Sequence, residues 1–341
     1  MRQLAIHGKA DLREESVPTP EPGAGQVRLR MAYAGICGSD LHYFFNGANG
    51  EFVVREPLVP GHEVSGVVDL DPSGELAPGT PVTVHPATFG PELAHVPAKR
   101  HLWPGGSYLG SASTWPHTQG GMAELLVVRK DMVRVLPDGL PLRRAALAEP
   151  LAVGLHAIAL AGGVSGKRVL VSGSGPIGLL LAAAAVVQGA AEVTSTDVLA
   201  EPLQRARTLG VQHTVQVGEQ DLPVEAYDVV FECSGVPAAI SPTFLAVRRA
   251  GVVVQVGMVP NGPAGLAVAP LISKEVEYRG CFRFDDEIDD AVQMLEGHPE
   301  LDSAITHVLP AHDAVRAFTV ARDSRASGKV LISLWQEVPE R

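Results

Sequence analysis

The chain has 341 residues, of which 46% are hydrophobic and 19% charged; this is an ordinary globular composition, and the length suggests two domains. Its net charge of −11 predicts an acidic surface that repels phosphate backbones, which excludes nucleic acid as a partner. Three widely spaced cysteines do not form a disulfide framework, the first residues lack a signal peptide, and the longest apolar run is too short for a bilayer, so we expect a cytoplasmic protein with no membrane partner.

Short β-strands separated by turns are expected in the first part of the chain. Residues 26–33 alternate polar and apolar side chains, as a half-buried strand does. Similar segments occupy residues 64–70, 80–85 and 123–129, with glycine and proline turn signals between them. Many short strands with such turns predict a β-rich, barrel-like unit.

The pattern changes near residue 150. Residues 142–160, rich in alanine and leucine, predict a helix. Strands and helices then alternate, with strands at 168–172, 191–196, 227–232 and 251–256 and helices at 177–188 and 202–209. This order predicts an α/β unit in which a doubly wound parallel sheet is covered on both faces.

The tail contains two amphipathic segments, residues 286–295 and 311–321, and one last strand, residues 329–334. A lone strand must pair with a sheet, so we expect the tail to return to the first unit. The prediction is therefore a catalytic domain of residues 1–150 plus 283–341, with a dinucleotide-binding domain of residues 151–282 inserted in it.

A glycine-rich turn marks the expected cofactor site. Gly173, Gly175 and Gly178 form a G-x-G-x-x-G pattern that follows a strand and opens a helix with Pro176 and Ile177. The first glycine permits the tight turn, the second lets the backbone approach a pyrophosphate, and the third allows close helix–strand packing. The helix N-terminus then offers unpaired N–H groups to the phosphates.

Asp197 ends the next strand, where a carboxylate binds the ribose hydroxyls of NAD and repels the 2′-phosphate of NADP. We therefore predict NAD as the cofactor. Ligands of such sheets bind beyond the carboxyl ends of the strands, so we expect Ser234 and Gly257, which follow two further strands, to line the nicotinamide end. The alternative is a glycine-rich turn in a domain that binds nothing.

Three residues of metal-binding type lie in two segments of the β-rich unit. Cys37 belongs to the segment GICGSDLH, and His62 and Glu63 belong to PGHEV. A thiolate, an imidazole and a carboxylate make a three-ligand zinc site with an open fourth position. The residues alone are only suggestive, because a single cysteine is usually a small buried apolar residue.

The order of these segments resembles that of the zinc-containing medium-chain dehydrogenases. GICGSDLH, PGHE, Glu149-Pro150 and SGSGPIG follow one another as they do in that family, and the sorbitol dehydrogenase branch is most similar. Within it, GICGSDLHYF, GSASTWPHTQGGMAELLVV and GCFRF resemble segments of L-idonate 5-dehydrogenases. The resemblance implies a GroES-like catalytic domain and an inserted Rossmann domain.

It also implies roles for residues at the metal. Cys37 and His62 match zinc ligands, and Glu63 matches an acid that is a ligand in some members only. Glu149 matches an acid that approaches the zinc directly or through water. Ser39 matches the hydroxyl that takes the substrate proton.

For three further residues, two roles each remain open. His42 would pass the proton outward, or is an ordinary surface histidine. Arg283 matches an arginine near the substrate, which clamps a polyol or a carboxylate, or else forms a salt bridge at the domain boundary. Tyr43 contacts the substrate or simply packs. Cys233 and Cys281 are expected to have no chemical role.

Many relatives carry a second, structural zinc bound by four cysteines, and residues 84–110, the matching lobe, contain none. A Cys₄ site is therefore impossible, and His85, His95 and His101 have no thiolate or acid cluster beside them to replace it. We expect proline-rich packing to hold this lobe. The resemblance alone suggests a homodimer or homotetramer.

The sequence thus predicts NAD-linked, zinc-dependent oxidation of a secondary alcohol of a sugar acid or polyol, as in L-idonate 5-dehydrogenases. Within this enzyme class, it also fits a sorbitol or xylitol type of polyol dehydrogenase, or a dehydrogenase for a threonine-like amino alcohol. Outside this class, the competing hypotheses are a metal-free reductase like the quinone reductases, a non-catalytic NAD-binding protein and a zinc hydrolase. The hydrolase leaves the dinucleotide loop unexplained.

Overall fold

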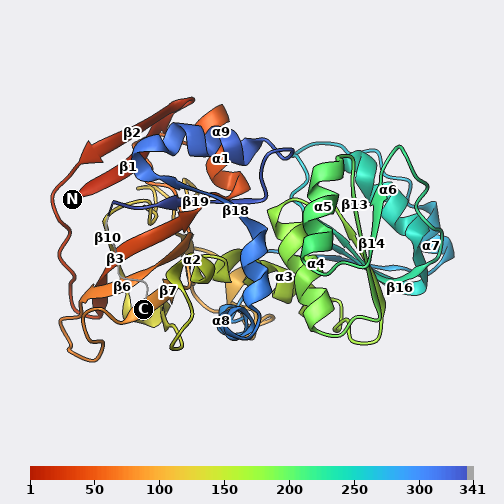
Figure 1. The fold of residues 1–341 in the computed structure, drawn as a ribbon, viewed down its shortest axis with the longest axis horizontal. Helices are drawn as coiled ribbons and strands as arrows, with labels where there is room; N and C mark the ends of the chain where they lie inside the picture. The colour runs from red at the N-terminus through yellow and green to blue at the C-terminus, as the bar shows by residue number, and fades with distance from the viewer. Residues whose placement is uncertain (336–341) are drawn as a thin grey trace.

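The computed structural model describes residues 1–335, which form two parts (Figure 1). The N-terminal strands and the C-terminal tail lie together at the left, and the parallel sheet with its helices lies at the right. None of the helices within residues 1–335 is long and apolar enough to cross a membrane.

A mixed sheet forms the centre of the first part. Its strand order is β11-β7-β6-β3-β19-β18, and β10 also pairs with β3. In β3, Val27, Leu29 and Met31 are fully buried and alternate with more exposed residues, as the sequence pattern predicts. The strands of this sheet are β3 (Gln26–Gly35), β6 (Glu63–Leu70), β7 (Pro81–Val84), β10 (Leu125–Arg129), β11 (Val133–Val135), β18 (Ile305–Pro310) and β19 (Lys329–Ser333).

Hairpins and helices surround this sheet. The hairpins are β1 (Arg2–Gly8) with β2 (Asp11–Ser16), β4 (Ala48–Asn49) with β5 (Phe52–Val53), and β8 (Ala87–Thr88) with β9 (Ser107–Tyr108). The helices are α1 (Gly38–Asn46) and α9 (Ala314–Arg322).

The tail returns to the N-terminal sheet. Strand β19 runs antiparallel to β3, with Leu331 opposite Gly35, and β18 pairs with β19 in parallel. A chain segment from each end thus builds one sheet and one apolar core. The exact domain limits remain a prediction, but this pairing is what the lone final strand required.

The second part is a six-stranded parallel sheet with the order β14-β13-β12-β15-β16-β17. From β12 the chain adds β13 and β14 on one side of the sheet and then β15, β16 and β17 on the other side. The strand order therefore reverses between β12 and β15. The strands are β12 (Arg168–Ser172), β13 (Glu192–Asp197), β14 (His213–Gln216), β15 (Tyr227–Glu232), β16 (Val247–Gln255) and β17 (Glu277–Gly280). The helices around it are α4 (Pro176–Val187), α5 (Ala200–Thr208), α6 (Pro237–Ala246) and α7 (Ala269–Ser273).

The α/β architecture, with a GroES-like and a Rossmann-type unit, is confirmed. One predicted helix is wrong in detail, because residues 142–160 form two helices, α2 (Leu142–Ala145) and α3 (Ala148–Leu160). The ring of Pro150 clashes with the carbonyl group four residues earlier in a continuous helix, so Pro150 is accepted only in a first turn. The break places Glu149 in the first turn of α3.

The lobe of residues 84–110 is attached to the tail by polar contacts. Arg100 donates hydrogen bonds from its backbone and its side chain to Asp285, at 3.0 and 2.9 Å, and pairs with Asp286. The His85 ring contacts the carbonyl oxygen of Asp285 at 2.5 Å. Contacts of one arginine with two acids therefore help to attach this lobe, and the expected proline-rich packing stays a prediction.

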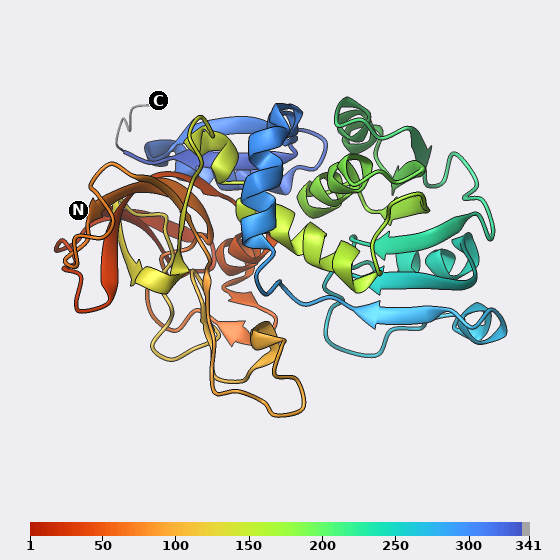
Figure 2. The same cartoon turned by 90° about the horizontal axis from the view of Figure 1, so that it is seen from below.

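Helix α8 (Ile288–Gly297) lies against α3 between the two parts (Figure 2). At its start Glu287 accepts hydrogen bonds from the His156 ring on α3, at 2.6 Å, and from the Asp285 backbone at 2.8 Å. Burial alone raises the pKa of Glu287, but the hydrogen bond and charge of His156 outweigh it and lower the pKa to about 2.

We expect Glu287→Gln to lower the free energy of unfolding by about 2 kcal/mol near pH 7. A lowered folded-state pKa gives stability that is present above the unfolded-state value, about 4.3, and is lost as the pH falls through the folded-state value. The difference between wild type and variant should therefore shrink as the pH falls from 5 toward 3 in denaturant titrations. Glu300→Gln, which alters an exposed acid–histidine pair, serves as the control and should change little. A constant difference across this range would contradict the assignment.

Candidate active site

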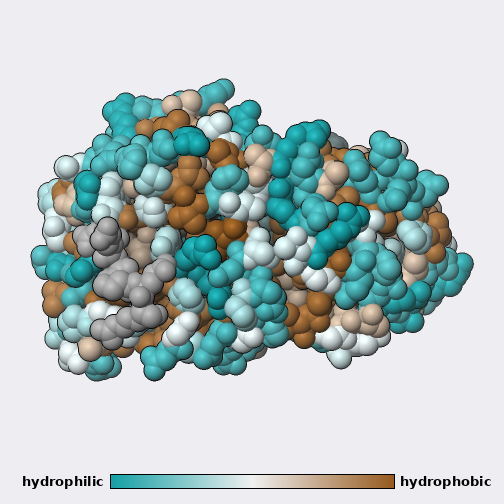
Figure 3. Space-filling view, in the orientation of Figure 1, coloured by the Kyte–Doolittle hydropathy of each residue, from teal (hydrophilic) through white to brown (hydrophobic). Residues whose placement is uncertain are grey.

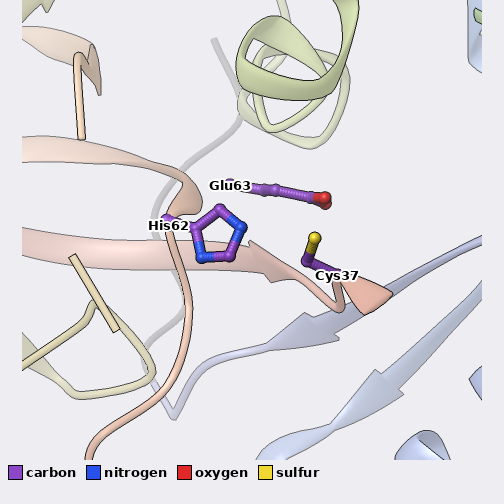
Figure 4. Close-up of side chains that lie close together, drawn as sticks. All are labelled: Cys37, His62 and Glu63. Atoms are coloured by element: carbon purple, nitrogen blue, oxygen red, sulfur yellow. The ribbon is translucent and has the colours of Figure 1, made fainter. Parts of the chain in front are cut away.

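Three potential metal ligands lie together beside the end of β3 and the start of β6. Figure 4 shows the sulfur of Cys37, the ring of His62 and the carboxylate of Glu63 converging. Their ligand atoms all lie within 4.8 Å of one another. Strand pairing causes this, because β3 and β6 are neighbours with Gly35 opposite Glu63, and Cys37 follows the end of β3. Two segments separated in the sequence therefore meet at one point.

Asp40, which the sequence analysis did not single out, joins these two segments. It is fully buried in the first turn of α1 and accepts hydrogen bonds from the backbone N–H groups of Cys37, at 2.9 Å, and Gly61, at 3.3 Å. Burial raises the pKa of Asp40, the largest effect on it. An acidic residue at position N3 of a helix often accepts a hydrogen bond from the backbone of the N-cap residue. Here Cys37 is the N-cap and Asp40 is N3, so this signal was visible in the sequence.

The donor set fits zinc. Zinc bonds of 2.0–2.3 Å to sulfur, nitrogen and oxygen need donors of this kind only a few ångströms apart. Nδ1 of His62 is buried and has no hydrogen-bond partner among residues 1–335. Burial alone lowers the pKa of His62, but the negative charges of Cys37, Asp40 and Glu149 raise it well above its usual value. The site therefore favours a positive charge at this point.

Glu63 is held by a buried lysine. Nζ of Lys329, on β19, lies 2.6 Å from each carboxylate oxygen of Glu63 and donates to the carbonyl oxygen of Ile36 at 3.1 Å. Both charged side chains are buried, so each compensates the desolvation of the other. No pattern in the sequence indicated a role for Lys329.

Glu149 approaches the same point from α3. It is buried, and its charge contributes to the raised pKa of His62. Its own pKa is raised by burial. The hydroxyl group of Tyr108, on β9, donates a hydrogen bond to Glu149 Oε1 at 2.5 Å. Glu149 is therefore close enough to interact with His62, but it is not among the three residues whose ligand atoms converge, and the two predicted acids are held by different partners.

Arg283 lies beside this cluster. Its guanidinium group stacks on the ring of Tyr108, with Cζ 4.0 Å from the ring centroid, and on that of Phe282 at 4.8 Å. Its backbone has a φ of 53°, a strained conformation for a residue other than glycine. No acid pairs with it in the part of the chain that the structure describes, which does not favour a salt bridge at the domain boundary.

The three remaining predicted residues all lie on α1, but their surroundings differ. Ser39 lies in the first turn, partly buried, with no side-chain hydrogen bond to another described residue. His42 is exposed, lines the cleft and contacts Asn49 Oδ1 at 3.0 Å. Tyr43 is 1% exposed, and its hydroxyl accepts a hydrogen bond from the Ala112 N–H at 3.0 Å. Packing, rather than substrate contact, accounts for this position of Tyr43.

A cleft of about 500 Å³ connects the metal ligands with the glycine-rich turn. Its lining includes Cys37, His42 and Glu63 from one side and residues 175–178 from the other. It opens between β12 and β15, where the strand order reverses. Figure 3 shows the side of the molecule seen in Figure 1, on which hydrophobic residues gather toward the middle and hydrophilic residues cover most of the parallel-sheet part.

The glycine-rich turn has the expected geometry. Gly173 has a φ of 94°, and a Cβ atom at Gly178 would lie 1.9 Å from the Gly173 carbonyl oxygen, so no other residue fits there. A Cβ atom at Gly175 would meet nothing within 4 Å, which leaves open space at the start of α4. Asp197 accepts hydrogen bonds from the N–H groups of Ser174 and Leu199, both at 3.0 Å.

The residues expected at the nicotinamide end follow β15 and β16. The Ser234 N–H donates to Glu232 Oε1 at 3.0 Å, and a Cβ atom at Gly257 would lie 2.2 Å from the Gly235 nitrogen. Cys233 lines the cleft, and burial raises its pKa well above the usual value.

Two family models match the sequence. The one described as an alcohol dehydrogenase GroES-like domain matches residues 23–138, and the one described as a zinc-binding dehydrogenase matches residues 176–297. Sorbitol dehydrogenase of Gallus gallus is 35% identical over 336 residues, covering 94% of this chain and 92% of that protein. Sorbitol dehydrogenase of Homo sapiens is 33% identical over 333 residues, covering 92% and 91%.

Two solved structures from Escherichia coli are similar throughout. L-idonate 5-dehydrogenase superposes with a TM-score of 0.91 at 32% identity, covering 97% of each chain. Galactitol-1-phosphate dehydrogenase superposes with a TM-score of 0.87 at 28% identity, covering 98% of this chain and 100% of that one.

Proposed function

We propose, on the premise that this chain belongs to the zinc-containing medium-chain dehydrogenases of the sorbitol dehydrogenase branch, that it oxidises a secondary hydroxyl group of a sugar acid with NAD. Family membership confirms three predictions: the chain is an alcohol or polyol dehydrogenase, it uses zinc, and it uses a nicotinamide dinucleotide. The preference for NAD over NADP rests on Asp197. What is proposed is that the substrate is a sugar acid and that the enzyme oxidises one of its secondary hydroxyl groups.

In this proposal Cys37, His62 and one of the two acids, Glu63 or Glu149, hold the metal. Bound zinc supplies polarisation of the substrate oxygen, and bound NAD accepts the hydride. The chain's own residues handle the proton: Ser39 accepts it from the substrate hydroxyl, and His42, which is exposed at the cleft, passes it to solvent.

Arg283 is the residue that favours a sugar acid as the substrate. It is a half-buried cation beside the metal ligands with no acidic partner among residues 1–335, and its ring stacking leaves the donors at its edge available. A carboxylate fits such a fork with two parallel hydrogen bonds. The similarity to L-idonate 5-dehydrogenase supports the same substrate class.

A neutral polyol is the second candidate. The similarity to sorbitol dehydrogenases supports it, and Arg283 can also donate hydrogen bonds to hydroxyl groups. A screen of NAD reduction over matched sugar acids and sugar alcohols, with and without a chelator, tests both. Chelator-sensitive turnover of sugar acids is the expected result, and no turnover of any hydroxyl compound would remove the proposal.

Arg283→Met should raise KM for the best sugar acid by about 30- to 150-fold, because the loss of a charge-assisted bidentate contact costs about 2–3 kcal/mol. KM for a matched neutral polyol should change by less than about threefold. Met keeps an unbranched, flexible side chain but lacks the guanidinium group, and like Arg it carries a Cβ atom, so the backbone conformation is equally constrained in both. Steady-state kinetics on both substrates, with a melting curve as a folding control, measure this. Equal effects on both substrates would favour the polyol.

The homodimer or homotetramer stays a prediction. Exposed apolar side chains at the outer edge of the parallel sheet, Ile272 on α7 and Tyr278 on the edge strand β17, favour contact between copies there.

A further inference from the structure

Tyr108 lies at the junction of the metal ligands and the proposed substrate arginine. It is 6% exposed on β9, in the lobe that lacks a structural zinc site, and no motif pointed to it. Three of its neighbours come from separate segments of the chain: Glu149 from α3, His62 from the start of β6 and Arg283 from the connection before α8.

The hydroxyl group of Tyr108 fixes one acid. Its bond to Glu149 Oε1, at 2.5 Å, is the only hydrogen bond of the Glu149 side chain among residues 1–335. Glu63 differs, because Lys329 occupies both of its oxygen atoms. Tyr108 therefore turns one Glu149 oxygen toward itself and leaves the other, Oε2, without a protein partner, available to a metal or to its water.

The ring of Tyr108 orients two further side chains. One contact is with the Arg283 guanidinium group, 4.0 Å from the ring centroid, as in a cation–π pair. The other is edge-on with the His62 ring, at a centroid distance of 5.4 Å. A single rigid side chain thus sets the spacing between the metal centre and the cation.

We propose that Tyr108 is a positioning residue that couples the metal site to the substrate site, its hydroxyl orienting Glu149 and its ring face orienting Arg283. The inference rests on the proposed function for the substrate half only. The metal half depends on Glu149 lying beside the metal held by Cys37 and His62, and its Co²⁺ bands and Co²⁺ affinity are measured without any substrate.

Two substitutions separate the halves. Tyr108→Phe keeps the ring and removes the hydroxyl, and Tyr108→Leu removes both. The control is Tyr227→Phe, which also removes a buried hydroxyl, one that contacts Thr194 inside the parallel sheet far from the metal ligands. The proteins are loaded with Co²⁺ in place of zinc, and their visible absorption bands, Co²⁺ affinity against a chelator, kcat and KM are measured.

Tyr108→Phe should shift the Co²⁺ bands and lower kcat about 10-fold while KM for the sugar acid changes less than about threefold. Tyr108→Leu should show the same changes and also raise that KM about 10-fold, because Arg283 loses its platform. Tyr227→Phe should match wild type in bands, affinity and kinetics.

Unchanged Co²⁺ bands in Tyr108→Phe would overturn the metal half, and an unchanged KM in Tyr108→Leu would overturn the substrate half. If wild type itself binds no Co²⁺ and no zinc, the proposed function fails first and the inference with it. If wild type binds Co²⁺ with bands that Tyr108→Phe leaves unshifted, only the inference fails.

Discussion

Cys37→Ser is expected to remove nearly all bound zinc and to lower kcat/KM by about 10³-fold or more. The Cys37 thiolate is one of only a few groups at the site that can bind zinc, whereas a serine hydroxyl remains protonated and binds zinc weakly. Without the metal, nothing in the cleft replaces the polarisation of the substrate oxygen, which is a contribution of several kcal/mol. Metal content per chain and steady-state kinetics measure the two effects.

Cys281→Ser is the matched control. Burial raises the pKa of the Cys281 thiol to about 12, so it stays protonated and is a poor ligand. The control should retain zinc and activity within about twofold. If Cys37→Ser kept a full complement of zinc, the proposed ligand set would be wrong; if it lost zinc but kept its activity, the metal would have only a structural role.

Asp197→Ser is expected to change the preference between cofactors. A carboxylate that accepts hydrogen bonds from two ribose hydroxyls contributes about 2–3 kcal/mol, so kcat/KM with NAD should fall about 100-fold. The loss of negative charge also removes the repulsion of a 2′-phosphate, so kcat/KM with NADP should stay constant or rise. The ratio of the two values is the measurement that decides.

Glu192→Gln is the control for this change. Glu192 begins the strand that Asp197 ends, so it lies at the opposite end of that strand, away from the expected cofactor site. It should leave the NAD to NADP ratio unchanged. An Asp197→Ser enzyme with the wild-type ratio would show that Asp197 serves only the turn, through its hydrogen bonds to Ser174 and Leu199.

Local sequence determined much of the parallel-sheet part. The glycine pattern at 173–178 specifies its own geometry, because Gly178 packs against the Gly173 carbonyl and any side chain there would collide with it. Continuous apolar runs predicted β12 and β15, since strands buried on both faces need no polar residues. The predicted helix from 142 to 160 is divided at residues 146–147, because Pro150 is accepted only in the first turn of a helix, and that signal was present in the chain.

The sequence by itself therefore determined the family, the two-part architecture and which residue types could bind zinc and NAD, because these depend on short segments with characteristic spacing. Only the tertiary structure decided how these residues are held. Lys329 reaches Glu63 and Tyr108 reaches Glu149 because the final strand and the lobe fold back onto the metal centre. Such contacts join residues far apart in the chain, so no local pattern records them. Their strength depends on burial, which exists only in the folded molecule.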